Sequence, residues 1–237
     1  MGWMDGVADL FVGAACAGCG RAGLGVCPGC RATLGSMASL CVRDGPSGGG
    51  FPATVFPETW ATWDYADLAR GIIVHHKDRG AWGLTGTLAD AVVVSMRALL
   101  TDVTTPVAVV PIPSDPRAIR DRGFDHGLAI ARAAARSWNR GTQVKVRVEE
   151  ALIRQRRADD QADLGADGRW VNQSGSMRGR PGRLPVIIVD DLVTTGATLM
   201  EARRALEASG RRVVGAACAA QTPRVLPLSP RGRTTSL

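Results

Sequence analysis

The chain has 237 residues, of which 45% are hydrophobic and 22% are charged. It is therefore long enough for one full core plus a small accessory module, and disorder throughout is excluded. The formal net charge of +7, carried almost wholly by arginine, indicates either affinity for phosphates, of a small substrate or of nucleic acid, or the codon bias of a GC-rich genome.

The first 15 residues contain an apolar patch but no Lys or Arg, so they lack the positive n-region of a signal peptide. No apolar run reaches the length of about 18 residues that a transmembrane helix needs. We therefore expect a cytoplasmic protein without a membrane segment, whose thiols are kept reduced.

Two C-x2-C pairs follow, separated by seven residues. Tetrahedral zinc is commonly held by four thiolates at such spacing, so we predict a structural Zn²⁺ site in a module spanning 1–44. Disulfides are the alternative. A further thiol, Cys41, is either the remnant of a third knuckle or, as we favour, a small buried residue, and Cys218 in an apolar stretch is expected in the core. The four predicted ligands are Cys16, Cys19, Cys27 and Cys30.

Composition divides the rest of the chain into a flexible linker at 45–52, a main domain at 53–221 and a disordered tail at 222–237. The segment 54–64 predicts one or two short strands. Its Trp60 and Trp63 are expected in the core or at the interface with the first module, rather than as platforms for nucleic-acid bases.

Helical spacing then predicts helices over 68–80 and 84–100, and alternation or apolar runs predict strands over 107–113 and 144–148. Adjacent His75 and His76 would point to different faces of the first helix, so they form no metal pair, and the cationic helix end is expected in solvent. A loop carrying Arg117, Arg120 and Arg122, before a helix beginning near Gly127, is a place where anions could bind.

The stretch 151–180 is the longest without an apolar period. Long polar segments of this kind are lids or disordered regions, and we favour a mobile lid that carries Arg154 and Gln161.

Four apolar residues, Val186 to Val189, then predict a buried parallel strand, with Asp190 and Asp191 just beyond its end. The loop that follows offers the hydroxyls of Thr194, Thr195 and Thr198 and the flexible Gly196 at the start of a helix. Unpaired helix-start amides suit a phosphate. The alternative is a strand, a turn and a Thr-capped helix with no ligand.

The segment 186–198 matches, without gaps, the 13-residue PRPP-binding signature of type I phosphoribosyltransferases. The order of motifs along residues 10–221 resembles the ComF family of phosphoribosyltransferase-like proteins. The motifs are the cysteine pairs, Lys77-Asp-Arg-Gly80, Val110-Pro-Ile-Pro113 leading to Arg122-Gly-Phe124, the series Arg154, Gln161, Arg169 and Asn172, and the signature itself.

The resemblance implies a zinc-ribbon module followed by a type I phosphoribosyltransferase fold, an α/β fold with a mainly parallel, five-stranded sheet flanked by helices. It implies that Asp190 and Asp191 bind the ribose hydroxyls of PRPP, with Mg²⁺ bridging ribose and pyrophosphate. Arg122 and Gly123 would face pyrophosphate, with Arg122 and both aspartates catalytic, and Lys77, Arg154 and Gln161 are further pyrophosphate or lid candidates. The 5′-phosphate would be held by Val193, Thr194, Thr195, Gly196, Ala197 and Thr198.

The expected activity is phosphoribosyl transfer to or from a base or an amine. The alternative, also implied by the resemblance, is a non-catalytic protein that handles single-stranded DNA during DNA uptake in competence; a regulator without catalysis is a third possibility. The sequence departs from the family pattern at several positions. Asp125 and His126 replace the usual Asn-Gln, and other departures are Asp44, Asp78 and Ala158.

Overall fold

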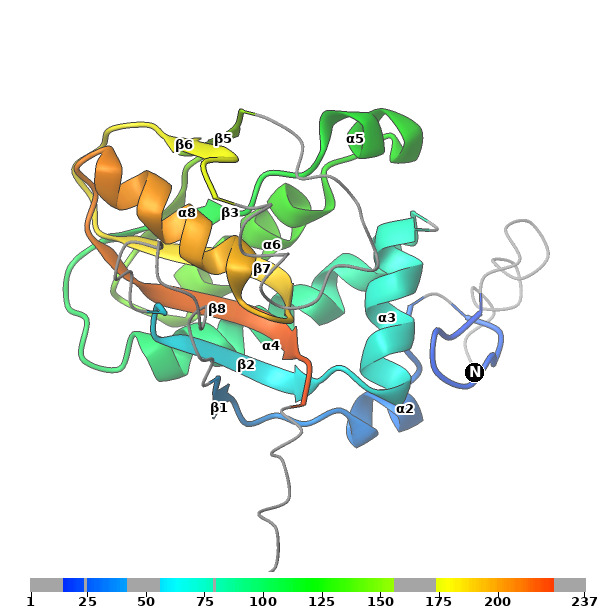
Figure 1. The fold of residues 1–237 in the computed structure, drawn as a ribbon. Coiled ribbons are helices and arrows are strands. Elements are labelled where there is room, and N and C mark those ends of the chain that lie inside the picture. The colour runs from blue at the N-terminus through cyan, green and yellow to red at the C-terminus, as the bar shows by residue number, and fades with distance from the viewer. Residues whose placement is uncertain (1–14, 24, 42–55, 79, 156–173, 224–237) are drawn as a thin grey trace, which may run out of the picture.

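The computed structural model describes residues 15–23, 25–41, 56–78, 80–155 and 174–223 (Figure 1). The predicted linker at 45–52, the lid residue Gln161 and the tail from 224 onward lie outside these ranges. Across the described part of the chain, no helix combines the length and the apolar character needed to cross a membrane.

A six-stranded sheet in the order β1-β2-β8-β7-β3-β4 forms the centre of the molecule. Within the described ranges, five neighbouring strands run parallel, and the short β1 pairs antiparallel with β2 at one edge. The α/β class with a mainly parallel sheet is therefore confirmed. The strands are β1 (Ser39–Leu40), β2 (Thr59–Asp64), β3 (Val107–Pro111), β4 (Val146–Val148), β7 (Val186–Val193) and β8 (Val213–Gln221).

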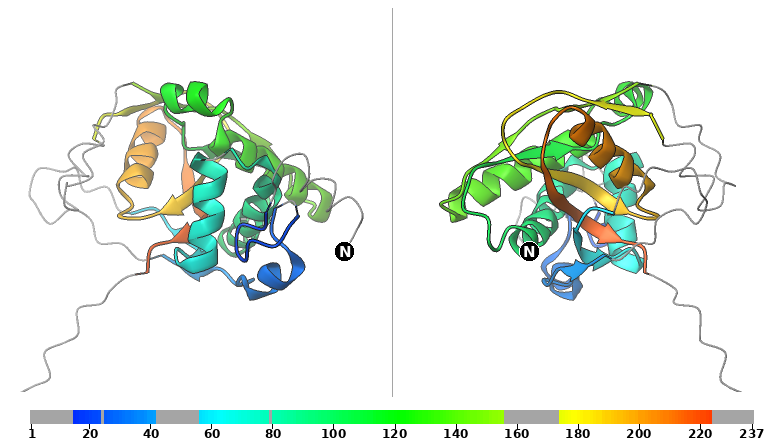
Figure 2. Two further views of the ribbon diagram at one scale, coloured as in Figure 1. Left: turned by 90° about the vertical axis from the view of Figure 1, so that its right-hand side faces the viewer. Right: turned by 60° about the vertical axis from the view of Figure 1, so that its left-hand side comes forward.

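Helices cover both faces of this sheet. Helices α4 (Thr85–Leu99) and α6 (His126–Gly141) pack on one face, and α8 (Ala197–Ala208) packs on the other. Figure 2 shows this layering, with α3 (Asp67–Asp78) standing beyond the carboxyl ends of the central strands. Because both faces are covered, the middle strands are continuous apolar runs rather than alternating ones.

The apolar half of β7 shows how the chain fills the two layers. Ile187 and Val189 belong to the core under α4 and α6, whereas Val186 and Ile188 belong to the core under α8. This follows from the two-residue period of a strand. The alternation changes at the end of β7, where Leu192 packs against the core under α4 and α6 and Val193 belongs to the core under α8.

The cysteine-bearing segment, which includes α2 (Pro28–Thr33), lies next to α3 and α4, where Arg31 donates to Thr87 and Asp90 of α4. Trp63 is buried, and its Nε1 donates to the Gly35 carbonyl at 3.0 Å; Trp60 is half-buried against the same core. Both tryptophans therefore pack as predicted. Cys41 and Cys218 are also buried as predicted, on the α8 side of the sheet.

Two segments differ from expectation. The loop expected before α6 contains a helix, α5 (Pro116–Arg122), which begins with Asp115 accepting from the Arg117 amide and ends at Gly123 with φ of 79°. An Asp cap, a proline in the first turn and a terminal glycine together favour a short helix. The ends of the polar stretch 151–180 pair as a hairpin of β5 (Leu152–Arg154) and β6 (Met177–Gly179).

Two residue placements also differ. Strand β7 continues through Asp190 and Asp191 rather than ending before them, because β8 pairs with it as far as Val193. His76 belongs to the helix end expected in solvent, but it also shares the helical spacing of Ile72 and Ile73, and it is fully buried with them. It lies under α4, where its Nε2 is 2.9 Å from Thr85 Oγ1.

Candidate functional site

The two aspartates of β7 point to opposite faces of the sheet. Asp190 has the parity of Val186 and Ile188, which face α8, whereas Asp191 has the parity of Ile187 and Val189. Sequence reasoning treated them as a pair on one loop. The strand instead gives each carboxylate its own surroundings at the same end of the sheet.

Asp191 is buried among basic side chains. Its side chain is 5% exposed, and Oδ2 lies 3.5 Å from His126 Nε2 and 4.0 Å from Lys77 Nζ. Among the described residues, Oδ2 has no hydrogen-bond partner. A buried carboxylate oxygen without a donor is costly, so the site favours a ligand that brings one.

Asp190 lies on the α8 side of the strand. Its Oδ1 accepts the Asp191 amide at 2.9 Å, and its register partner on β8 is Cys218. Burial, together with the neighbouring Asp191 carboxylate, raises the pKa of Asp190 to about 8. This side chain therefore keeps its proton to a higher pH than an ordinary carboxyl group, and in the protonated form it can donate as well as accept.

The loop after β7 leads directly into α8. Gly196 precedes the first turn of α8 with φ of 84°, and a Cβ built there would lie 2.5 Å from Phe56 Cε2. Thr195 Oγ1 accepts the Ala197 amide at 3.4 Å, whereas Thr194 is exposed. The Thr222 amide donates to the Val193 carbonyl at 2.9 Å, and Thr198 is half-buried in the first turn.

Of the predicted cations, Lys77 on α3 approaches Asp191, and Arg122 on α5 contacts the backbone of Lys77. Arg122, at the end of α5, donates through Nη1 to the Lys77 carbonyl and through Nε to the Ala118 carbonyl, each at 2.9 Å. The Asp191 carboxylate is the main reason that the pKa of Lys77 is raised. Arg122 thus joins α5 to α3, and Gly123 supplies the left-handed turn that follows it.

Arg154 is the last residue of β5, which pairs with β6 outside the main sheet. Its Nη2 donates to the Pro113 carbonyl at 3.1 Å, and its buried Nε has no partner among the described residues. The structure therefore brings β5 to the carboxyl end of β3. Of the predicted lid residues, Gln161 falls outside the described ranges.

Two buried imidazoles complete the surroundings of Asp191, and sequence reasoning gave neither a role. Burial lowers the pKa of His76 to about 4. The ring centroids of His76 and Phe124 lie 5.4 Å apart in an edge-on arrangement. Burial also lowers the pKa of His126, whose Nδ1 is 3.2 Å from Ser114 Oγ. In the sequence, His76 shares the helical spacing of Leu68 and Ile72, and His126 is a departure from the family motif.

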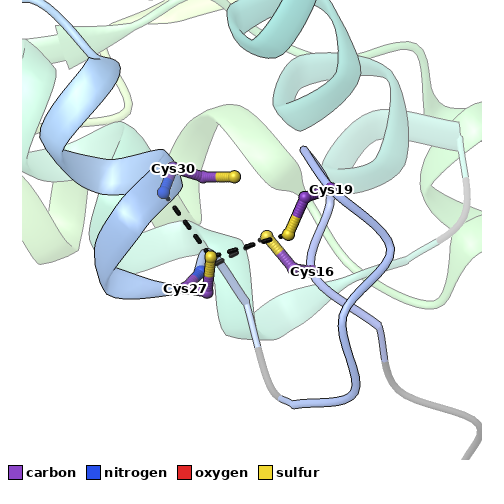
Figure 3. Close-up of side chains that lie close together, drawn as sticks. All are labelled: Cys16, Cys19, Cys27 and Cys30. Atoms are coloured by element: carbon purple, nitrogen blue, oxygen red, sulfur yellow. Dashed lines mark hydrogen bonds between the residues drawn. The ribbon is translucent and has the colours of Figure 1, made fainter.

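A second cluster contains the four predicted cysteines (Figure 3). Their sulfur atoms lie within 4.8 Å of one another, with Cys19 and Cys27 Sγ 3.7 Å apart. A tetrahedron with Zn–S bonds of about 2.3 Å has edges of about 3.8 Å. The four thiols, none of them in a disulfide, could therefore hold a zinc ion.

Backbone amides already point at this cluster. Cys16 Sγ accepts the Cys27 amide at 3.3 Å and the Gly18 amide at 3.5 Å. Burial alone would raise the pKa of Cys16. Hydrogen bonds from backbone amides outweigh burial and lower the pKa to about 6. Hydrogen bonds that the Cys30 thiol makes with the Cys19 and Cys27 sulfurs favour its protonated form and raise the pKa of Cys30 to about 12. Amide donors stabilise thiolates, the form in which cysteine binds metal.

Within the described ranges, the cysteines are the only group of three or more side chains placed to ligate a metal. The end of β7 offers two carboxylates, which is too few for a cage built from protein alone. Mg²⁺ is commonly held by one or two carboxylates together with substrate phosphates. No protein-family model matches the chain, and no curated protein matches it either.

Proposed function

We propose that the chain binds PRPP at the carboxyl end of β7 and is a phosphoribosyltransferase-like protein of the ComF type. One observation carries the proposal: Asp191 is buried with an unpartnered carboxylate oxygen, next to Lys77, at the start of an uninterrupted strand–loop–helix signature. The expectation of a type I phosphoribosyltransferase fold belongs to the same proposal and is supported by the strand order.

Each part of PRPP has a chemically suitable neighbour. The ribose hydroxyls can donate to Asp191 and exchange hydrogen bonds with the protonated form of Asp190. The 5′-phosphate suits the amides at the start of α8, where Gly196 lets the backbone turn. Pyrophosphate suits Lys77 and Arg122, which lie on the Asp191 side of the strand.

The proposed reaction breaks the bond between ribose C1 and a pyrophosphate oxygen and forms one between C1 and a nitrogen of a base or amine. Pyrophosphate leaves with the bonding electron pair, so negative charge builds on it. Lys77 and Arg122 stabilise that charge, which is commonly the largest catalytic contribution. Mg²⁺, which fits the Asp191 carboxylate together with substrate oxygens, would neutralise part of the same charge.

The first test is calorimetry of PRPP with Mg²⁺. We expect the double variant Asp190→Asn with Asp191→Asn to weaken binding at least about 100-fold, the effect of losing two hydrogen bonds to charged or polar groups. Asp102→Asn, an exposed aspartate in a turn after α4, is the matched control and should bind like wild type. Equal affinity of wild type and the double variant ends the proposal.

Turnover is a separate question. Pyrophosphate release from PRPP, measured across a panel of nucleobases and amines, identifies the acceptor. Tight PRPP binding without release for any acceptor would leave a PRPP-binding protein without catalysis, and would remove the enzyme assignment.

A second candidate function is the handling of single-stranded DNA. It is favoured by α5, which presents exposed Arg117 and Arg120 close to Arg122, and by the net charge of +7. Binding through phosphates weakens steeply with salt. A titration with single-stranded oligonucleotide between low and physiological salt tests it, and an affinity indifferent to salt, or no binding, excludes it.

A further inference from the structure

The turn at 16–19, called here the cysteine turn, carries the first cysteine pair and packs against α3. A Cβ built at Gly71 of α3 would lie 3.0 Å from the Ala17 carbonyl oxygen, closer than side chains normally approach. A Cβ built at Gly18 would overlap Leu68 Cδ1, one helical turn earlier on α3. Two glycines therefore bring the backbone of this turn into direct contact with the helix, and a larger residue at Gly71 would force the two apart.

The second cysteine pair belongs to the start of α2, which is attached to α4 instead. Arg31 of α2 donates through Nη2 to Thr87 Oγ1 at 3.0 Å and through Nη1 to Asp90 Oδ2 at 3.3 Å. Thr87 is buried, so its hydroxyl is a fixed point on α4. The four sulfur atoms lie between the cysteine turn and α2 (Figure 3). A metal ion held by these sulfurs would therefore tie the contact with α3 to an anchor on α4.

The far end of α3 holds both of the cations proposed for pyrophosphate. Lys77 Nζ lies 4.0 Å from Asp191 Oδ2, and the Lys77 carbonyl accepts from Arg122 Nη1 at 2.9 Å. The cysteine turn and these cations are joined by a single helix of 12 residues, which transmits a shift at one end to the other. Ile72 and Ile73 hold one face of this helix against the core, and the cysteine turn covers the adjacent face.

We propose that the cysteine-bearing segment, once it holds a metal ion, is a clamp that positions α3 and with it Lys77 and Arg122. Leu68 and Gly71 are positioning residues, because they act on the ligand only through the end of the helix. Loss of the metal should weaken the affinity for pyrophosphate while the ribose and 5′-phosphate sites on β7 and α8 keep theirs. The inference takes its ligand from the proposed function, whereas the clamp itself is a property of the ligand-free protein.

The first experiment measures amide hydrogen exchange in ligand-free protein by mass spectrometry. Zinc-loaded wild type is compared with protein stripped of zinc by a chelator that is then removed. We expect peptides of α3 to exchange at least about tenfold faster without zinc, and peptides of α8, on the far face of the sheet, to exchange unchanged. Added zinc should restore α3. Equal exchange of α3 in both states, equal acceleration of α3 and α8, or a protein that takes up no zinc overturns the inference.

The second experiment compares two ligands by calorimetry, Mg²⁺-PRPP and ribose 5-phosphate, of which only the first contains pyrophosphate. Gly71→Leu pushes α3 off the cysteine turn. It should weaken PRPP binding about 10- to 100-fold, the loss typical of a hydrogen bond to a charged group, and ribose 5-phosphate binding by less than about threefold. Gly86→Leu is the matched control, because a Cβ built there meets no atom within 4 Å. A loss in Gly71→Leu that is absent, equal for both ligands or matched by Gly86→Leu overturns the positioning role.

Lys77→Ala shows whether the effect of Gly71 passes through the end of the helix. If it does, the double variant Gly71→Leu with Lys77→Ala loses less PRPP affinity than the product of the two single losses, and a full product overturns the transmission. If Gly71→Leu does not fold, Leu68→Ala removes the contact with Gly18 without adding bulk and should show the same selective loss. If wild type binds no PRPP, the proposed function fails, while hydrogen exchange still decides whether the cysteine-bearing segment holds α3.

Discussion

Replacing Gly196 with alanine tests the loop between β7 and α8 with little change in chemistry. The position has φ of 84°, a conformation that costs an L-residue about 1–2 kcal/mol. A new Cβ would lie 2.5 Å from Phe56 Cε2, so the ring must move off Ala197 and Met200. Overpacking of this kind typically costs about 1–3 kcal/mol.

Two other glycines separate these effects. Gly123 has a similar φ of 79° but no atom within 4 Å of its built Cβ, so Gly123→Ala should lose only the backbone contribution of about 1–2 kcal/mol. Gly86 lies in the first turn of α4 with equally open space, so Gly86→Ala should be neutral or gain up to about 1 kcal/mol. Gly196→Ala should lose roughly 2–5 kcal/mol, the sum of both effects.

Urea denaturation of the three variants measures the differences in the free energy of unfolding. Adding Phe56→Ala to Gly196→Ala should recover part of the loss, giving a coupling of about 1 kcal/mol or more in a double-mutant cycle. If Gly196→Ala costs no more than Gly123→Ala, the contact with Phe56 has no energetic role, and the account of this turn is refuted.

Two further predictions concern the cysteine cluster and the buried histidine. Protein purified under reducing conditions should hold about one zinc per chain, and Cys30→Ser should lose it and become more sensitive to trypsin at Arg31; wild type without zinc would contradict this. Burial lowers the pKa of His76 from its ordinary value of 6.5 to about 4 in the folded protein, so protonation favours the unfolded chain. The contribution of neutral His76 to the free energy of unfolding is complete above pH 6.5. It declines by about 3 kcal/mol as the pH falls to 4. His76→Leu should not show this decline, and equal pH dependence in both proteins would exclude His76 as its source.

Much of the fold could be predicted because periodicity reports directly on burial. The apolar run of β7 and the helical spacing of α4 each indicate which side chains leave water, and the structure buries them as expected. The paired cysteines were equally informative, since a C-x2-C turn brings two sulfurs together without help from the rest of the chain.

The surroundings of Asp191 could not be predicted in this way. Lys77 and His126 come from α3 and α6, and their approach to β7 depends on packing between segments more than 60 residues apart in sequence. The burial of His76 has the same origin, because Thr85 and the ring of Phe124 contact its side chain. A local pattern contains no information on such contacts, so His126 looked only like a departure from a family motif.

The length of β7 changes what the two aspartates can do. Had the strand ended at Val189, both carboxylates would have shared one loop and repelled an anionic ligand together. Because the strand continues, Asp190 turns toward α8, where burial raises its pKa to about 8, and Asp191 turns toward Lys77. At neutral pH the pair therefore carries less negative charge than its sequence suggests. That arrangement lets one end of a sheet present acceptors to hydroxyl groups while Lys77 and Arg122 still attract phosphates.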